Sequence, residues 1–238
     1  MPWAVIIICI TAVAALLPVA LKWRTEAFEQ IVRDIREAVI VFAHPDDETM
    51  FFLPLISLLN KNKIPFKLLC LSTGDFDGLG KIRIKEIEAV GRALGAKRVD
   101  VLDDPRLRDG PIYWDSQAVA SSIETYLSKH QLVDVLFTFD DYGVSGHPNH
   151  ISVHRGVAVL KTPTRYTLGS VSMVRKYFPI FDFFLTLISG PSLVAVNLED
   201  PMLSLNTMQL YGSQNVWFRK LFSVFSRYSY INTFQRLE

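Results

Sequence analysis

Short apolar runs that alternate with helical patterns constrain the fold more than any other feature of this sequence. Four runs read as strands of a sheet: Ala38–Ala43, Phe66–Leu71, Arg98–Leu102 and Asp134–Phe139. Amphipathic, helix-like segments follow them in turn: Asp47–Asn60, Lys81–Leu94, Ser116–His130 and Asn149–Leu160. This alternation is typical of an α/β fold with a doubly wound, largely parallel sheet. We therefore expect a Rossmann-like domain that binds its ligand at the carboxyl ends of the strands.

Length and composition restrict the class of protein further. The chain has 238 residues, enough for one ordinary α/β domain, and its 25 basic against 24 acidic side chains give a net charge of +1. A balance of this kind lacks the basic field of a nucleic-acid-binding protein. Cys9 and Cys70 both lie in apolar segments, which favours a reducing compartment over a disulfide. We predict no nucleic-acid partner and no stable protein partner.

The N-terminus has the pattern of a membrane anchor. Ala4–Leu21 carries no charge, and Lys22 and Arg24 follow it directly. A bilayer span takes about 20 apolar residues. A cleaved signal peptide is the alternative, but Met1–Trp3 contains no Lys or Arg, which favours a retained anchor. Because the basic side chains all follow the segment, the positive-inside rule places the rest of the chain in the cytosol. We expect an anchor over residues 1–24 and one catalytic domain over residues 25–238.

Two polar clusters follow the first and the fourth predicted strands. The first runs AHPDDE from residue 43, and the second runs GHPNH from residue 146, with His154 one helical turn later. His44 and Asp47 can turn towards one point, and His150 can reach the same point if the two strands are near each other. Two imidazoles and one carboxylate make a catalytic zinc set that leaves a fourth position for water. Two further residues, Asp46 and His147, are then candidates for proton transfer and for oxyanion stabilisation.

Each cluster also has an ordinary structural interpretation. Acidic residues at the start of a helix, such as Asp46 and Asp47, stabilise the helix dipole without any catalytic role. A single loop histidine is more often hydrogen-bonded than metal-bound, and His154 is better explained by helix packing than by zinc ligation. The coincidence of both clusters at strand ends is what favours a metal site.

These motifs carry a family resemblance. AHPDDE after the first strand, together with the G-H-x-N-H motif near residue 146, resembles the LmbE-like zinc deacetylases. The apolar start, LLCLSTGDFDGLGKIRIKE, VSGHPNH and the C-terminal WFRKLFSVFSRYSYIN are similar to the narrower PIG-L group of that superfamily. The resemblance extends over nearly the whole chain. It implies hydrolysis of the N-acetyl group of N-acetylglucosaminyl-phosphatidylinositol, at the endoplasmic reticulum membrane, in the synthesis of glycosylphosphatidylinositol anchors.

The resemblance also implies roles for individual residues. His44, Asp47 and His150 would bind Zn²⁺ or another divalent metal, Asp46 would be the general base, and His147 would contact the tetrahedral intermediate. Weaker candidates for substrate contacts, each with a surface role as its alternative, are Arg83, Asp104 and Tyr142. The sequence departs from bacterial relatives at Asn149, where they usually have Asp, and at Ser145, where they usually have Tyr.

Two segments near the C-terminus admit a membrane interpretation. Trp217–Tyr228 has apolar residues at helical spacing between basic ones, which fits either a membrane-surface helix or an ordinary core-facing helix. Phe178–Val196 is apolar but is interrupted by Asp182 and Gly190, so we predict strand and loop there and no second span. The rival functions are a related deacetylase of a soluble acylamino sugar and a catalytically silent lipid-binding or scaffold protein.

Overall fold

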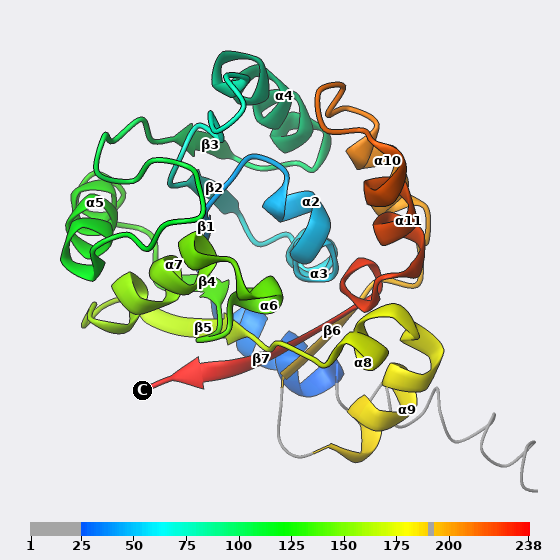
Figure 1. Cartoon of the computed structure of the whole chain (residues 1–238). Coiled ribbons are helices and arrows are strands. Elements are labelled where there is room, and N and C mark those ends of the chain that lie inside the picture. The colour runs from blue at the N-terminus through cyan, green and yellow to red at the C-terminus, as the bar shows by residue number, and fades with distance from the viewer. Residues whose placement is uncertain (1–24, 190–192) are drawn as a thin grey trace, which may run out of the picture.

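A computed structural model describes residues 25–189 and 193–238. Its centre is a seven-stranded sheet with the order β3-β2-β1-β4-β5-β7-β6 (Figure 1). The strands are β1 (Ala38–Phe42), β2 (Phe66–Cys70), β3 (Arg98–Val101), β4 (Val135–Phe139), β5 (Thr164–Leu168), β6 (Leu193–Val196) and β7 (Ile231–Leu237). The first five strands pair in parallel, whereas β7 runs antiparallel to both β5 and β6. The predicted α/β fold with a largely parallel sheet is confirmed.

Helices connect the strands. They are α2 (Asp47–Phe51), α3 (Leu53–Lys61), α4 (Gly80–Ala93), α5 (Ser116–Ser128), α6 (Gly143–Gly146), α7 (Pro148–Ala158), α8 (Met173–Tyr177), α9 (Pro179–Ile188), α10 (Leu203–Met208) and α11 (Trp217–Phe225), with a 3₁₀ turn η1 (Arg227–Ser229). Residues 25–33 are helical as well. Within this helix, Phe28 is fully buried and packs on Phe137 and Phe234, so residues that precede β1 are part of the hydrophobic core.

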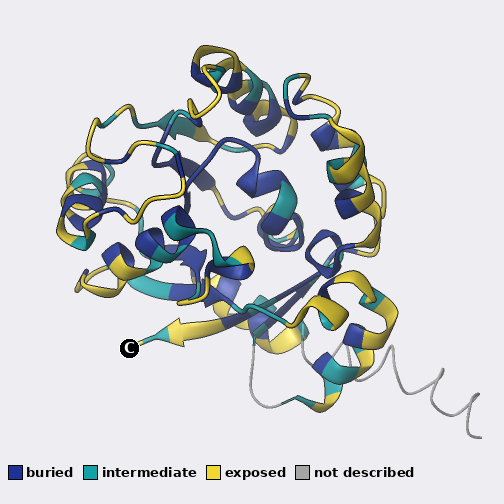
Figure 2. Ribbon diagram, viewed as in Figure 1, coloured by how far each residue is buried: buried dark blue, intermediate teal, exposed yellow. Residues whose placement is uncertain are grey.

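The strand order places the two polar clusters side by side. Because β1 lies between β2 and β4, the direction in which strands are added reverses at β1. The pairings Ala38↔Val135 and Ile40↔Phe137 bring the carboxyl ends of β1 and β4 to the same edge of the sheet. Both strands are buried along their whole length, as their continuous apolar runs predict (Figure 2).

Three expectations need correction or fall outside the structure. The segment predicted as one helix over Asp47–Asn60 is two helices, α2 and α3, with a break at Phe52. Phe178–Val196 was predicted as strand and loop, but it contains the helix α9 before the strand β6; Asp182 does not interrupt this helix, because its carboxylate is buried in ion pairs. The predicted anchor, Ala4–Leu21, lies outside the described residues. Among residues 25–189 and 193–238, no helix combines the length and the apolar character needed to cross a bilayer.

Candidate active site

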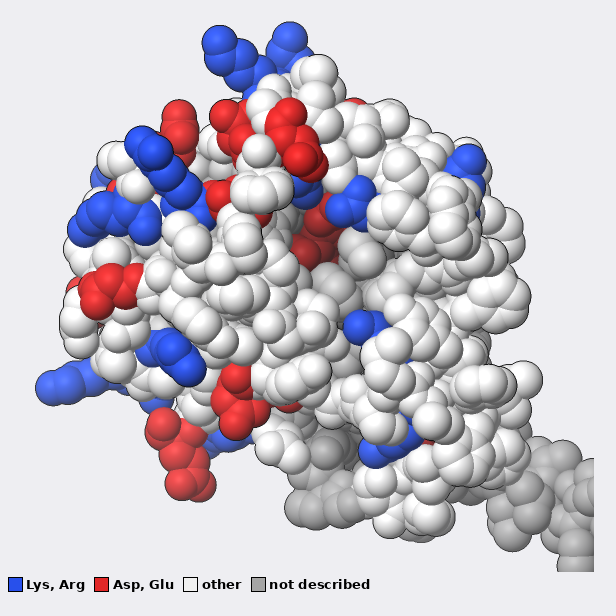
Figure 3. All heavy atoms as spheres, in the orientation of Figure 1, with Lys and Arg blue, Asp and Glu red and all other residues white. Residues whose placement is uncertain are grey.

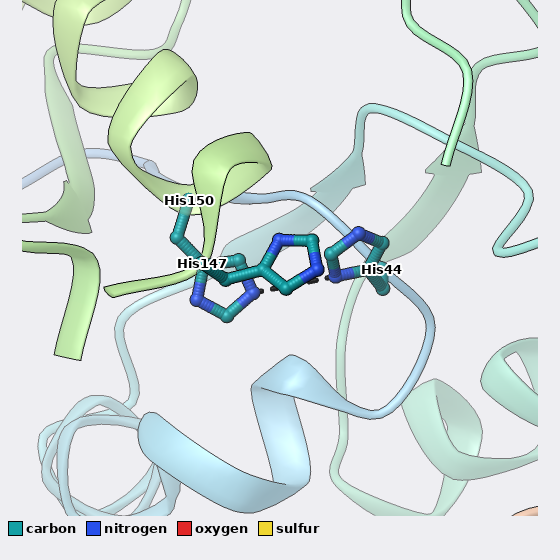
Figure 4. Close-up of side chains that lie close together, drawn as sticks. All are labelled: His44, His147 and His150. Carbon is teal, nitrogen blue, oxygen red and sulfur yellow. Dashed lines mark hydrogen bonds between the residues drawn. The ribbon is translucent and has the colours of Figure 1, made fainter. Parts of the chain in front are cut away.

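Three side chains meet between the ends of β1 and β4. His44 comes from the loop after β1, Asp47 is the first residue of α2, and His150 lies in the first turn of α7. His150 Nε2 is 3.3 Å from His44 Nδ1 and 3.3 Å from Asp47 Oδ1, and His44 Nδ1 is 3.6 Å from Asp47 Oδ2. All three residues are buried. Figure 4 shows the two imidazoles turned towards each other, beside His147.

Other contacts fix the direction in which each of these ligand atoms points. The second nitrogen of His44, Nε2, lies 3.0 Å from Asp109 Oδ1 and 2.9 Å from Asn149 Oδ1. The His150 Nδ1 donates to the Gly143 carbonyl at 3.1 Å. A metal-binding histidine usually donates its other N–H to a carboxylate or a backbone carbonyl in this way. His44 Nδ1 and His150 Nε2 are therefore the atoms left to face one another.

This arrangement fits a tetrahedral metal ion. Ligand atoms at about 2.0–2.2 Å from zinc lie roughly 3.3–3.6 Å apart in a tetrahedron, and the three measured separations fall in that range. Although burial disfavours the charged imidazolium, Asp109 and Asp47 raise the pKa of His44 to about 10. The same negative field that favours a proton on His44 favours a bound cation. By distance alone, the nitrogens of His44, His147 and His150 also form a group that can hold a metal.

His147 occupies a different position from the other two histidines. It is the N-cap of α7, and its Nδ1 accepts the backbone N–H of Asn149 at 3.2 Å. Burial, together with the positive charge of His44 and His150, lowers the pKa of His147 to about 4. The ring is therefore neutral at pH 7 and carries its proton on Nε2. His147 is a hydrogen-bond donor to the cavity.

Asp46 adopts a backbone conformation that L-residues rarely visit, with φ of 119° and ψ of −20°. Its Oδ2 lies 2.8 Å from Arg219 Nη2 and 3.3 Å from Arg83 Nη2, but at angles that give this buried oxygen no aligned hydrogen bond. Burial raises the pKa of Asp46, and the two guanidinium groups oppose that rise. The carboxylate thus keeps a lone pair for another partner.

Glu48 holds the Asp46 turn from below. Its carboxylate accepts the backbone N–H of Asp46 at 3.2 Å, the Thr49 hydroxyl at 2.8 Å and the Tyr211 hydroxyl at 2.7 Å. Glu48 is fully buried, and burial raises its pKa to about 7 against the effect of these hydrogen bonds. Because Tyr211 follows α10, the C-terminal part of the chain supports the loop that carries Asp46.

Two glycines make the close contacts of the site possible. An added Cβ at Gly74 would lie 2.6 Å from the guanidinium of Arg83, which donates to the Gly74 carbonyl. An added Cβ at Gly143 would lie 2.6 Å from the Cβ of His150. Both glycines have positive φ angles, of 69° and 66°, which other residues adopt at a cost. The backbone therefore approaches both functional side chains more closely than any other residue type would allow.

These residues line a cavity of about 470 Å³. His44, Asp46, Asp47, His147 and His150 share its wall with Asp109, Ser145, Gln214 and Arg219, among others. Figure 3 shows a hollow on this face of the molecule, with acidic and basic side chains together at its base. A buried carboxylate, a donor imidazole and a cation-binding cluster around one cavity are the parts required for metal-assisted hydrolysis.

The comparisons with known proteins agree with this chemistry. A family model described as PIG-L, GlcNAc-PI de-N-acetylase, matches residues 39–161. The probable N-acetylglucosaminyl-phosphatidylinositol de-N-acetylase of Schizosaccharomyces pombe is 34% identical, over 85% of this chain and 87% of its own length. The chain belongs to the PIG-L family. The N-acetylglucosaminyl-phosphatidylinositol de-N-acetylase of Bos taurus is 32% identical, over 82% of this chain and 81% of its own length.

A solved structure shares the fold at low identity. The zinc-inhibited form of the teicoplanin deacetylase Orf2 superposes with a TM-score of 0.60 and 11% identity, covering 84% of this chain and 98% of its own. At this identity the likeness establishes the fold and leaves the chemistry to the residues of the site.

The three weaker substrate candidates have different places in this PIG-L protein. Arg83 is buried against Asp46 and lines the cavity. Asp104 is not brought to the metal-binding cluster: its carboxylate pairs with Arg106 at 2.6 Å and lines a neighbouring cavity of about 420 Å³. Tyr142 is 57% exposed and lines a third cavity, beside α8. His154 donates to or accepts from its own surroundings at the Phe139 carbonyl, 3.1 Å away, and does not line the active cavity.

Sequence reasoning missed two charged residues of the site, Asp109 and Arg219. Asp109 lies in the long loop after β3, which also ends at the ligand-binding edge of the sheet, so the topology alone gave a weak signal for it. Arg219 lies on α11, outside the residues matched by the family model. No local pattern singles it out, because only the packing of α11 brings it to Asp46.

Proposed function

We propose that this protein hydrolyses the N-acetyl group of N-acetylglucosaminyl-phosphatidylinositol, giving glucosaminyl-phosphatidylinositol and acetate. The proposal rests on one observation above all: relatives with that named activity are 32–34% identical over more than 80% of the chain. The intact set of polar residues around the cavity supports it. A catalytically silent scaffold has no need for a buried, ion-paired cluster of this kind, because burying charges is costly.

The donor set supports a zinc-dependent reaction. His44, Asp47 and His150 would hold the ion, and the backbone N–H groups of Ala43 and His44 orient Asp47 by donating to its Oδ2 at 3.1 and 2.8 Å. When bound, zinc polarises the amide carbonyl and acidifies its water. Asn149 and Asp109 keep His44 in the tautomer that leaves Nδ1 free for the ion.

Asp46 and His147 supply the proton chemistry. Asp46 has a buried oxygen without an aligned hydrogen bond, which suits it to accept a proton from the attacking water. The Nε2–H of the neutral His147 suits a different task, donation to the oxygen that becomes negative when water adds to the amide. After that addition, Asp46 carries the proton that the leaving amine nitrogen requires.

The test is a deacetylation assay with the purified full-length protein and N-acetylglucosaminyl-phosphatidylinositol. We expect release of acetate, loss of activity after treatment with a chelator and recovery on addition of zinc. Turnover of a soluble N-acetylglucosamine derivative without turnover of the glycolipid would instead favour the alternative deacetylase. Absence of any hydrolysis by zinc-loaded protein would favour the scaffold.

The lipid substrate motivates a membrane location. We propose that residues 4–21 anchor the protein in the endoplasmic reticulum membrane with the active site in the cytosol, since Lys22 and Arg24 follow that segment. Protease added to sealed microsomes should then digest the catalytic body. Protection of the body, or glycosylation of an acceptor site placed in the loop at residues 140–145, would reverse this orientation.

A further inference from the structure

The helices α8, α9 and α11 expose an unusual number of large apolar side chains. We call this set the α8–α11 surface: Met173, Val174, Tyr177, Phe178, Ile180, Phe181, Phe184, Ile188, Trp217, Phe218, Leu221, Val224 and Phe225. Ile180, Ile188 and Trp217 are 78%, 81% and 72% exposed. Figure 2 shows α9 and the outer side of α11 as largely exposed or partly exposed. Single exposed apolar residues are ordinary, but a contiguous set of this size marks an interaction site.

The same elements enclose an apolar groove of about 1000 Å³. Phe178, Phe181 and Phe184 line one side, and Val224 and Phe225 of α11 line the other. The groove is wider than the catalytic cavity and has a different character, since neither a carboxylate nor a basic group lines it. Its chemistry suits hydrocarbon.

A buried ion-pair network fixes the orientation of α9. Asp182 is fully buried and lies 2.7 Å from Arg227 Nε, and Arg175 also contacts it. Thr186, one turn along the same helix, hydrogen-bonds to Asp182. Breaking a buried pair of this kind is strongly unfavourable, so α9 cannot easily turn its apolar face inward. The outward position of Phe181 and Phe184 is therefore a built feature of the fold.

The charges on these helices suit a lipid surface. Asp182 is the one acidic residue within α8, α9 and α11, and it is buried, whereas Lys220 is exposed. Figure 3 shows this side of the molecule largely free of charged side chains, next to the hollow of the active site. Exposed Glu199 and Asp200 follow Leu198 at the edge of the groove. Tryptophan and an exposed lysine beside aliphatic residues are typical of segments at a membrane interface.

One helix connects this surface to the catalytic cavity. Arg219 of α11 reaches Asp46 at 2.8 Å, while Trp217 and Leu221, two residues to either side, point to solvent. A helix that lies on a membrane with Trp217 and Leu221 would therefore hold the wall of the active site at the level of the lipid headgroups.

We propose that the α8–α11 surface docks on the lipid bilayer and brings the mouth of the active cavity to the headgroup layer. The choice of lipid as the partner rests on the proposed function, because an acyl-chain-bearing substrate must be reached in the membrane plane. It also rests on the lack of an exposed acid on the three helices and on the shared helix α11. The docking is a second membrane contact, separate from any anchor in residues 1–24.

Depth-dependent quenching tests the docking without requiring activity. Full-length Cys9→Ser protein, in which the remaining Cys70 is buried, is given one new cysteine by Ile180→Cys, Ile188→Cys or Trp217→Cys and labelled with a fluorophore. The protein is placed in nanodiscs of phosphatidylcholine with or without nitroxide-labelled lipid. We expect strong quenching at all three positions and none at Ile82→Cys or Leu132→Cys, which are 50% and 58% exposed and lie elsewhere. Equal quenching at all five positions, or at none, would overturn the proposal.

A kinetic comparison separates docking from catalysis. The double variant Ile180→Glu/Ile188→Glu should lower the rate on glycolipid in vesicles about tenfold or more at limiting substrate, since two apolar anchors are lost. Its rate on a water-soluble, deacylated substrate should equal that of the wild type. If soluble turnover is absent in the wild type too, the proposed function fails while the quenching result still decides the docking. If the double variant instead converts a dimer to a monomer and keeps its rate on vesicles, the surface binds a second copy and the proposal is wrong.

Discussion

The two ends of the chain contribute to the site in different ways. Residues 39–161, which match the PIG-L family model, supply His44, Asp46, Asp47, His147 and His150 from loops at the ends of parallel strands. Residues 163–238 add the antiparallel strands β6 and β7 and several helices that pack beside the cavity. From this second region, Arg219 and Tyr211 reach the first, directly at Asp46 and through Glu48.

The difference separates chemistry from access. The first region buries its polar residues, and each has a partner that fixes its direction, as preorganised catalytic groups require. The second region exposes apolar residues on α9 and α11 and buries the charges that hold those helices in place. A family model that ends at residue 161 therefore describes the reacting groups but leaves out the surface through which we propose the substrate is met.

Loss of a metal ligand should have the largest effect. We expect His150→Ala to lose bound zinc and all measurable activity, because even residues that only orient a ligand are worth roughly 10–100-fold in metal affinity. Metal analysis of the purified protein gives the stoichiometry. The matched control is His154→Ala, one turn further along α7, which removes an imidazole that contacts the Phe139 carbonyl. A fully active, zinc-loaded His150→Ala protein would contradict the assignment.

Asp46→Asn should lower turnover about 10²–10⁴-fold while the zinc stays bound, since the change removes a base and leaves the ligands in place. Asn is the best replacement at this position, because it tolerates the positive φ of 119° better than most residues. Rates and zinc content are measured on the same preparation. If Asp46→Asn loses the metal while Asp47→Asn keeps it, the two roles are exchanged.

Arg219→Ala tests the contribution of the second region to the chemistry. Burial raises the pKa of Asp46, and Arg219 is the strongest influence against that rise, so its removal should raise this pKa further. Because the base must be ionised, the acid limb of the pH–rate profile should move to higher pH, with a loss in rate of about tenfold near neutral pH. Arg219→Lys, which keeps the charge, should restore most of the limb. An unchanged profile in both variants would confine the chemistry to residues 39–161.

The parallel half of the fold and its polar clusters were predictable because their signals are local. Buried strands such as Ala38–Phe42 are continuous apolar runs, and the topology of a parallel sheet brings their carboxyl ends together. The meeting of His44, Asp47 and His150 follows from that topology and from short spacing along the chain.

The remaining features depend on contacts between distant residues. Asp182 interrupts an apolar pattern in the sequence, and only its ion pair with Arg227, far along the chain, makes α9 a stable helix with a buried acid. Asp109 lies in a loop without periodicity, so its contact with His44 has no local signature. Residue patterns cannot report such pairings, because tertiary packing decides them.

Tyr211→Phe should reduce stability more than activity. It removes a hydroxyl that donates to the buried Glu48 at 2.7 Å, at a cost of about 1–3 kcal/mol in the free energy of unfolding. A smaller loss of turnover should follow, because Glu48 also holds the Asp46 backbone. Thermal and urea unfolding measure the first effect. Tyr230→Phe is the control, since its hydroxyl bonds to the exposed end of α11 at the Val224 carbonyl. Equal losses in both variants would remove the special role of Tyr211.

Asp104→Asn should have the smallest effect and defines the edge of the site within residues 39–161. The Arg106 guanidinium lowers the pKa of Asp104 from 3.8 to about 2. A lowered pKa in the folded state stabilises the protein above pH 3.8, and this stabilisation is lost as the pH falls towards 2. Because the Arg106 side chain is 55% exposed, solvent screens the pair, and Asp104→Asn should cost about 0–1 kcal/mol at pH 7 and still less near pH 2. Unfolding curves at the two pH values measure this difference.

Turnover of the glycolipid by Asp104→Asn should equal that of the wild type, because Asp104 lines the neighbouring cavity and lies outside the one that contains His44. The two cavities share Phe76 and Asp109 in their walls, which gives this prediction its force. A rise in KM without a change in zinc content would mean that part of the substrate extends past Asp109 into that cavity. The boundary between the reacting groups and the rest of the first region would then lie beyond Asp104.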